Sequence, residues 1–236
     1  MNGTAIMAIP ALVALTGGIL AAIWKPSHQM RSLIQHFAAG VVLAALAVEL
    51  LPEIQREHAP APVLLLSFAL GSLFMYALRL VTERLEGGHE GESGGGLGIG
   101  LLLATFIDVA MDGFIIGAGF AATQETGTIL ALGLSVELLF LGLALTSDSV
   151  KGGRIVLVSG ALGGVVLACA LLGRTVLAGA SHVVLGGTLA FSAAALLYLV
   201  TEELLMEAHT VKEKPISTLV LFAGFLCFWG IQLQGQ

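Results

Sequence analysis

Charged residues are scarce in this sequence. Only 11% of the 236 residues are Asp, Glu, Lys or Arg, whereas soluble domains carry about 25%. Because 57% of the residues are hydrophobic, the chain has too little polar surface for water, and an integral membrane protein is predicted instead. Basic residues are scarcer than acidic ones. The resulting net charge of −6 argues against a nucleic-acid partner, which would favour clustered Lys and Arg.

Cysteines are few, and no secretion signal is predicted. The two cysteines, Cys169 and Cys227, lie inside apolar runs, so the sequence offers neither a disulfide framework nor a zinc-ribbon spacing. The first apolar run has no basic residues before it and exceeds the apolar core of about 7–15 residues found in signal peptides. We therefore expect it to be a true membrane span.

Long apolar runs dominate what the sequence does contain. Each has close to the ~20 residues that a helix needs to cross a bilayer, and none shows the alternation of a barrel strand. The sequence predicts one all-α polytopic membrane domain over residues 1–236, surrounded by lipid. Its eight transmembrane helices are expected at about residues 4–24, 33–52, 62–82, 97–120, 127–146, 154–174, 183–205 and 216–234.

The basic residues between these spans predict an orientation. If the N-terminus lies outside the cytoplasm, Arg56 and Arg174 fall outside and eight basic residues fall inside. This bias satisfies the positive-inside rule, so both termini are expected outside, in a plasma (inner) membrane. The inner set is Lys25, Arg31, Arg79, Arg84, Lys151, Arg154, Lys212 and Lys214.

A glycine-rich, acidic segment at residues 85–96 connects the third and fourth spans. Its composition predicts a flexible cytoplasmic loop. Two interpretations are open, a plain tether or a metal-collecting segment in which His89 acts with neighbouring glutamates.

The sequence also contains an internal repeat. Residues 37–53 and 191–207 share seven of 17 aligned positions, including Glu49 with Glu203 and Glu53 with Glu207. Because the second and seventh spans run in opposite directions, this similarity predicts inverted-repeat character, which is common in transporters. A weaker pairing relates Asp108 of the fourth span to Glu137 of the fifth.

Carboxylates lie inside the apolar runs, at Glu49, Asp108, Asp112, Glu137, Glu202 and Glu203. Each costs about 2.5–3.5 kcal/mol at a helix centre, and no basic residue lies deep in any predicted span. Shared protons or a bound cation therefore have to compensate the charge. Asp108 and Asp112 share one helix face because they are four residues apart.

The interpretations that are open differ from one of these residues to the next. Glu49 and Glu203 are near helix ends, where solvation and ligation both account for them. Glu202 must point away from its neighbour Glu203 and is a secondary candidate. Met111 could be a thioether ligand or a packing residue.

At these positions the sequence resembles the ZIP family of divalent-metal transporters. Residues 37–53 are similar to that family's second span, and residues 197–207 are similar to its seventh. Asp108-Val-Ala-Met-Asp-Gly113 corresponds to the family's His-Asn-x-Pro-Glu-Gly pattern, and Glu137-Leu-Leu-Phe-Leu-Gly142 corresponds to the related pattern of the fifth span. Asp108 stands where the family has histidine, and Leu138 and Leu141 replace two further ligands.

The resemblance implies a homodimer that moves a divalent cation into the cytoplasm by an elevator-like motion. It also implies that Asp108, Asp112, Glu137 and Glu203 hold one ion, drawn from Zn, Mn, Fe or Cd. An all-carboxylate set favours harder ions such as manganese. The alternatives are a diverged carrier of another cation or proton-coupled cargo, or a non-transporting regulatory membrane protein. No enzymatic activity is predicted, since no span holds a Ser/His dyad and the HExxH motif is missing.

Overall fold

The fold is all helical throughout the part of the chain that the computed structural model describes, residues 3–24, 26–87, 99–144, 152–205 and 216–235. Eight helices there are long and apolar enough to cross a membrane, which confirms the predicted fold class. They are α1 (Gly3–Ile23), α2 (His28–Ala45) continuing through η1 (Leu46–Leu50) and α3 (Leu51–Arg56), α4 (Ala61–Gly87), α5 (Ile99–Ala122), α6 (Gln124–Ala144), α7 (Gly152–Leu177), α8 (His182–Leu199) continuing through η2 (Val200–Leu204), and α10 (Ile216–Gly235). The glycine-rich segment lies outside the described residues from position 88 onward.

The second and seventh spans repeat each other in structure as well as in sequence. Ser27 caps α2 and Ser181 caps α8, each accepting a hydrogen bond from the backbone N–H three residues later. Ser27 precedes Phe37 by the same distance in sequence as Ser181 precedes Phe191. The π-helical turns η1 and η2 then begin equally far after these phenylalanines. The inverted repeat therefore includes a wide helical turn around its shared glutamate position.

The packing contacts divide the eight helices into two bundles. In the first bundle α5 packs on α7, while α1 packs on both α6 and α7. In the second, α2 packs on α10 and α4 packs on α8. The contacts between bundles are less extensive and involve mainly α2 with α6 and α5 with α4 and α8.

Glycines bring helix backbones into direct contact within each bundle. A Cβ atom added at Gly17 of α1 would lie 2.6 Å from the carbonyl O of Leu139 in α6, and one at Gly71 of α4 would lie 2.5 Å from that of Phe191 in α8. Gly224 of α10 meets the Phe37 carbonyl of α2 in the same way, so the repeat extends to these contacts. Small residues of this kind allow the close packing that holds membrane helices together.

The boundary between the bundles is built differently, and we call it the seam. Gly133 of α6 faces α2 and α10 there, but its neighbours are the side chains of Ala45 and Phe228. A Cβ atom at Gly133 would lie 3.2 Å from the Ala45 Cβ. At Gly133 the seam is thus formed by side-chain contacts, in contrast to the backbone contacts at the glycines inside the bundles.

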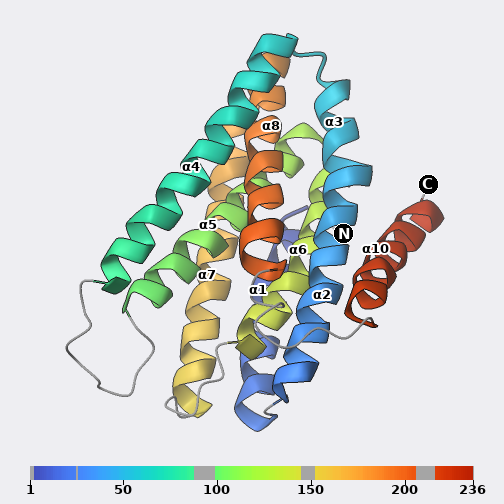
Figure 1. The fold of residues 1–236 in the computed structure, drawn as a ribbon. Coiled ribbons are helices and arrows are strands. Elements are labelled where there is room, and N and C mark those ends of the chain that lie inside the picture. Colours follow the sequence, from blue (N-terminus) through green and yellow to red (C-terminus); the bar gives the residue numbers. More distant parts are fainter. Residues whose placement is uncertain (1–2, 25, 88–98, 145–151, 206–215, 236) are drawn as a thin grey trace.

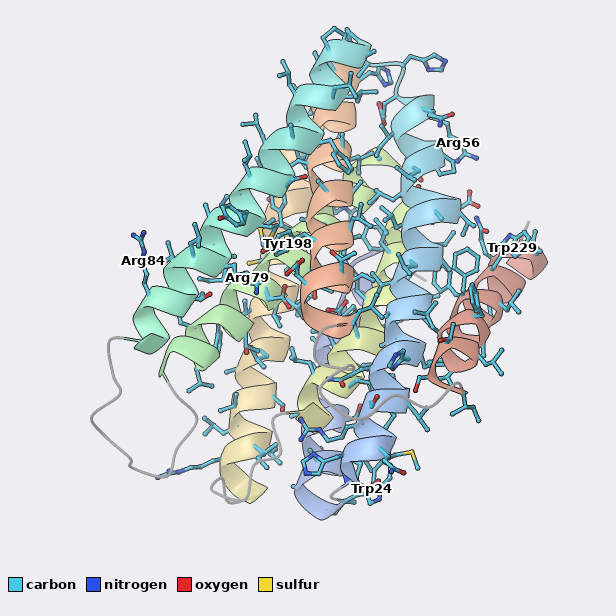
Figure 2. All side chains as sticks on the ribbon, in the orientation of Figure 1. Trp24, Arg56, Arg79, Arg84, Tyr198 and Trp229 are labelled. Atoms are coloured by element: carbon cyan, nitrogen blue, oxygen red, sulfur yellow. The ribbon has the colours of Figure 1, made fainter. Side chains whose placement is uncertain are left out.

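The outer faces of α4 and α10 are strongly apolar and exposed, and the two helices lie at opposite edges of the molecule (Figure 1). Leu65 is 72% exposed and Leu219 is 67% exposed, which suits contact with lipid tails rather than water. Trp24 and Arg56 lie near opposite ends of the helices (Figure 2), and such amphipathic side chains are typical of the two membrane interfaces.

Candidate metal centre

Two buried aspartates lie one turn apart on α5. Asp108 is 8% exposed and Asp112 is 1% exposed, and their neighbour Val109 is fully buried. The four-residue spacing places both carboxylates on the same face of the helix, as the sequence predicts. This face is directed toward the interior of the first bundle.

The third acid comes from α6. Glu137 is 5% exposed. One carboxylate oxygen from each of Asp108, Asp112 and Glu137 lies within 4.8 Å of the other two. Among the described residues these are the ones that gather closely enough to hold a metal ion. We call Asp108, Asp112 and Glu137 the acidic cluster.

Close packing of α5 on α6 brings these residues together. Gly119 of α5 faces Gly127 of α6, where an added Cβ atom would lie 3.1 Å from the Gly127 Cα. The Leu130 side chain packs around these glycines at 2.7 Å from the added Cβ atom of Gly119, and the Phe120 side chain lies closer still to that of Gly127, so the two helices interlock here. Replacing either glycine by a larger residue would push the carboxylates of α5 away from Glu137.

The geometry of the acidic cluster fits a bound cation. Like charges at such separations oppose each other's ionisation, and a bound cation or a shared proton relieves this repulsion. Two oxygens that bind the same divalent ion at about 2.0–2.6 Å can be no more than about 5 Å apart. The observed limit of 4.8 Å meets this condition.

The remaining predicted ligands have different outcomes. Met111 adjoins the cluster in sequence but is partly buried and packs against the hydrophobic core, which is the packing interpretation. The backbone of Glu203 belongs to η2, whereas its side chain lies outside the described part of the chain. His89 also lies outside it, so both stay predictions.

Glu49 is buried away from the acidic cluster. Its side chain is 5% exposed, and its two oxygens accept hydrogen bonds from Thr126 at 2.8 Å and from Gln232 at 3.3 Å. The sequence suggested either solvation at a membrane interface or metal ligation. In the structure this carboxylate has protein donors from helices far away in the sequence, and a role as metal ligand stays a prediction.

Glu202 corrects another expectation. Sequence analysis found no countercharge for the acids within the spans, but Arg79 of α4 forms an ion pair with Glu202 of η2. Both side chains are partly exposed, with exposed fractions of 38% and 36%. The arginine lies near the end of a long helix, and its extended side chain reaches the acid from there. Glu202 is therefore a partner of Arg79.

Three polar residues near the interior were missed by the sequence analysis. Thr126 and Gln232 bind Glu49, and His36 is 3% exposed with its Nδ1 atom 2.8 Å from the Ser32 carbonyl O. A helical threonine or glutamine gives no signal by itself, because its partner lies on another helix. The repeat and the position of Glu49 inside an apolar run were the signals that pointed to Glu49.

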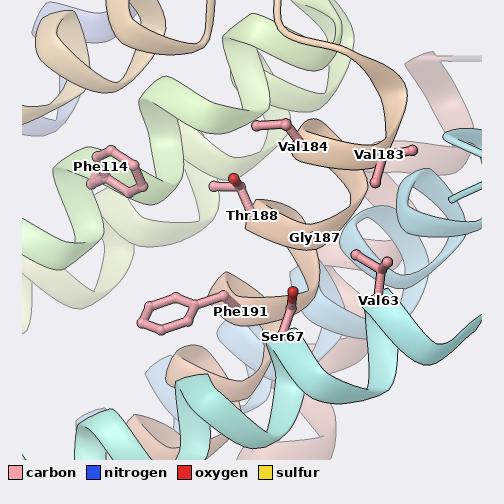
Figure 3. Close-up of a pocket in the computed structure, with 8 residues that line it drawn as sticks. All are labelled: Val63, Ser67, Phe114, Val183, Val184, Gly187, Thr188 and Phe191. Carbon is pink, nitrogen blue, oxygen red and sulfur yellow. The ribbon is translucent and has the colours of Figure 1, made fainter. Parts of the chain in front are cut away.

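The acidic cluster is separate from a recess between α5, α4 and α8. A cavity of about 420 Å³ opens where Phe114 of α5 faces α4 and α8 (Figure 3). Its lining is mostly apolar, with hydroxyl groups from Ser67 and Thr188. No member of the acidic cluster lines it, so this recess lies on the seam and not at the candidate metal centre.

Comparison with known proteins gives no assignment. No protein-family model matches the chain, and no curated protein matches it significantly.

Proposed function

We propose that this protein transports a divalent metal cation across the membrane through the acidic cluster. The observation that carries the proposal is the meeting of three buried carboxylates, from two helices, inside a multi-pass membrane protein. Such a concentration of negative charge is costly in hydrocarbon, and a passing cation explains why the protein contains it. The resemblance to the ZIP family at the same residues supports this class of cargo.

The ligand set bears on which ion is carried. Three carboxylates supply hard oxygen donors, which suit manganese and other hard ions, whereas imidazole would favour zinc. Our proposal covers Zn, Mn, Fe and Cd, and the three carboxylate ligands favour manganese among them. Glu203 of the seventh span is proposed as a further ligand on the basis of the family resemblance alone.

The two-bundle architecture supports an elevator-like transport step. The acidic cluster lies in the bundle of α1, α5, α6 and α7, whose helices are joined by backbone contacts. We propose that this bundle slides against the other, releasing the ion into the cytoplasm. In this scheme both termini face outward from a plasma (inner) membrane, and the protein works as a homodimeric carrier rather than an enzyme.

Uptake of radioactive Mn, Zn, Fe and Cd into proteoliposomes tests the proposal. We expect saturable uptake of at least one ion by the wild type and near-background uptake by Asp112→Asn, because the variant loses a charged ligand at the centre of the cluster. Glu57→Gln is the matched control. Glu57 is also a buried carboxyl group, but it is bonded to His182 outside the cluster, so its variant should retain uptake.

Absence of saturable flux for all four ions would contradict divalent transport. Anomalous scattering from crystals soaked with Mn would then decide between the remaining functions. An ion at Asp112 without flux would favour a regulatory membrane protein that senses metal. Neither ion nor flux would favour a carrier of another, proton-coupled cargo, in which the cluster shares protons.

A further inference from the structure

The hydrogen bonds of Glu49 connect three helices across the seam. Glu49 lies in η1 of the second bundle, and its Oε1 atom accepts the hydroxyl proton of Thr126, at 2.8 Å, from α6 of the first bundle. Gln232 of α10 donates to the other oxygen and also to the Val48 carbonyl O, at 3.2 Å. The carboxylate is thereby fixed to its own bundle by Gln232, while it holds a residue of the other bundle.

The beginning of α6 is organised to make this contact. Thr123 caps the helix by accepting the Thr126 N–H at 3.0 Å, and its own hydroxyl donates to the Thr126 Oγ1 atom at 2.8 Å. Because the Thr126 oxygen already accepts a proton, its own proton is directed to Glu49. The first turn of a helix also favours a negative charge. Thr126 is fully buried, so water does not compete.

The same helix carries a member of the acidic cluster. Glu137 follows Thr126 by three helical turns, which is about 16 Å along the axis. Since α6 is joined backbone to backbone with α1 at Gly17, α6 cannot shift by itself. A contact that fixes its first turn therefore fixes the position of Glu137 and of the whole first bundle.

The contact is specific to one position of α6. Sliding by one helical turn, about 5.4 Å, toward the N-terminal end of α6 would bring Leu130 opposite Glu49. Leu130 is fully buried and apolar, and offers no donor to the carboxylate. One-turn displacements of packed helices are a known form of switching between two states.

We propose that Glu49 is a positioning residue, which Gln232 holds and Thr126 binds, and that it stabilises this arrangement of the two bundles. The Glu49–Thr126 hydrogen bond must then break when the first bundle slides. The proposal rests on the proposed transport function for its purpose, but the contact itself can be tested without measuring flux. A hydrogen bond to a charged group contributes enough to shift such an equilibrium about tenfold.

The chain offers a direct way to measure the position of α6. Cys227 of α10 and Leu132 of α6 line the same cavity, of about 260 Å³, and both side chains are exposed. Spin labels attached at Cys227 and at Leu132→Cys, in a Cys169→Ser background, report the distance across the seam in liposomes. Pulsed electron–electron double resonance measures the distribution of distances between the two labels, which gives the populations of the two arrangements.

We expect Thr126→Val, which keeps the shape but removes the hydroxyl, to raise the population ratio of a second distance about tenfold. Thr126→Ser restores the donor and should give the wild-type distribution. Thr128→Val is the matched control, because Thr128 is an exposed threonine of the same helix whose hydroxyl binds the Gln124 carbonyl O of its own helix. Gln232→Leu, which removes the second donor, repeats the test if Thr126→Val does not fold.

Identical distance distributions in Thr126→Val, Thr126→Ser and Thr128→Val would overturn the positioning role. This failure is distinct from failure of the proposed function. If divalent uptake is absent but the second distance grows in Thr126→Val, the contact positions the bundles and the cargo is different. If uptake is present and the distances do not change, the transport proposal stands without this contact.

Discussion

The interior of the first bundle and the seam beside it both contain buried carboxylates, but their surroundings differ. Inside the bundle, helices meet through backbone contacts such as Gly17 with Leu139, and three acids gather within 4.8 Å. At the seam, helices meet through side chains, and Glu49 is matched by the protein donors Thr126 and Gln232. The interior is suited to hold a cation in a rigid frame, while the seam is suited to come apart and form again.

The largest difference is expected from metal addition to purified protein in detergent. A divalent ion present at 100 times its dissociation constant should stabilise the wild type by about 2.7 kcal/mol. Asp112→Asn should lose this stabilisation, because removing a ligand lowers the affinity for the metal by at least about 100-fold. Losing a residue that only supports a ligand lowers the affinity for the metal by about 10–100-fold. Thermal unfolding with and without Mn measures both effects.

Without metal the same variant should unfold at a higher temperature than the wild type. Neutralising one of three clustered carboxylates relieves their mutual repulsion, and binding sites are commonly less stable than their neutral variants.

Glu49→Gln is the seam counterpart and should keep the metal-dependent stabilisation. A comparable loss in Glu49→Gln would show that the seam acid also binds the ion.

An intermediate effect is expected from filling a backbone contact inside the bundle. Gly17→Ala places a Cβ atom 2.6 Å from the Leu139 carbonyl O, and such overpacking costs about 1–3 kcal/mol. Gly230→Ala is the matched control, since no atom lies within 4 Å of its added Cβ. Its unfolding temperature should stay the same or rise, because alanine favours helix. Equal melting of the two variants would contradict a rigid bundle interior.

The smallest effect on stability is expected at the seam itself. Gly133→Ala brings a Cβ atom to 3.2 Å from the Ala45 Cβ and 3.3 Å from a Phe228 ring carbon. These side chains can adjust, so the free energy of unfolding should change by less than about 1 kcal/mol. The rate of Mn uptake should nevertheless fall, since the added methyl group obstructs sliding. A large loss of stability with unchanged uptake would reverse the comparison.

Part of this organisation follows from local sequence rules. Apolar length alone predicts eight spans, and eight helices in the described part of the chain are long and apolar enough to cross a membrane. The repeat around Glu49 and Glu203 predicts that the two segments share a local structure. Sequence similarity does not reveal that this structure is a π-helical turn. The four-residue spacing places Asp108 and Asp112 on one face, because helical periodicity is fixed by the backbone.

Other relationships depend on contacts between distant segments. Arg79 looked too far from the span centres to pair with an acid, yet α4 packs on α8 and brings it to Glu202. Thr126 carried no signal in the sequence, because its role depends on Glu49, which lies 77 residues away. Such pairs are set by the rotation and crossing of packed helices, which no local pattern specifies.

The sequence by itself determined that this chain is a multi-pass membrane protein with eight candidate spans, since this depends on composition and on the fixed rise and pitch of a helix. Only the tertiary structure decided that Glu137 joins Asp108 and Asp112 while Glu49 joins Thr126 and Gln232. The physical reason is that α5 packs on α6, and α2 packs on α6 and α10, so this packing of distant segments determines which side chains meet.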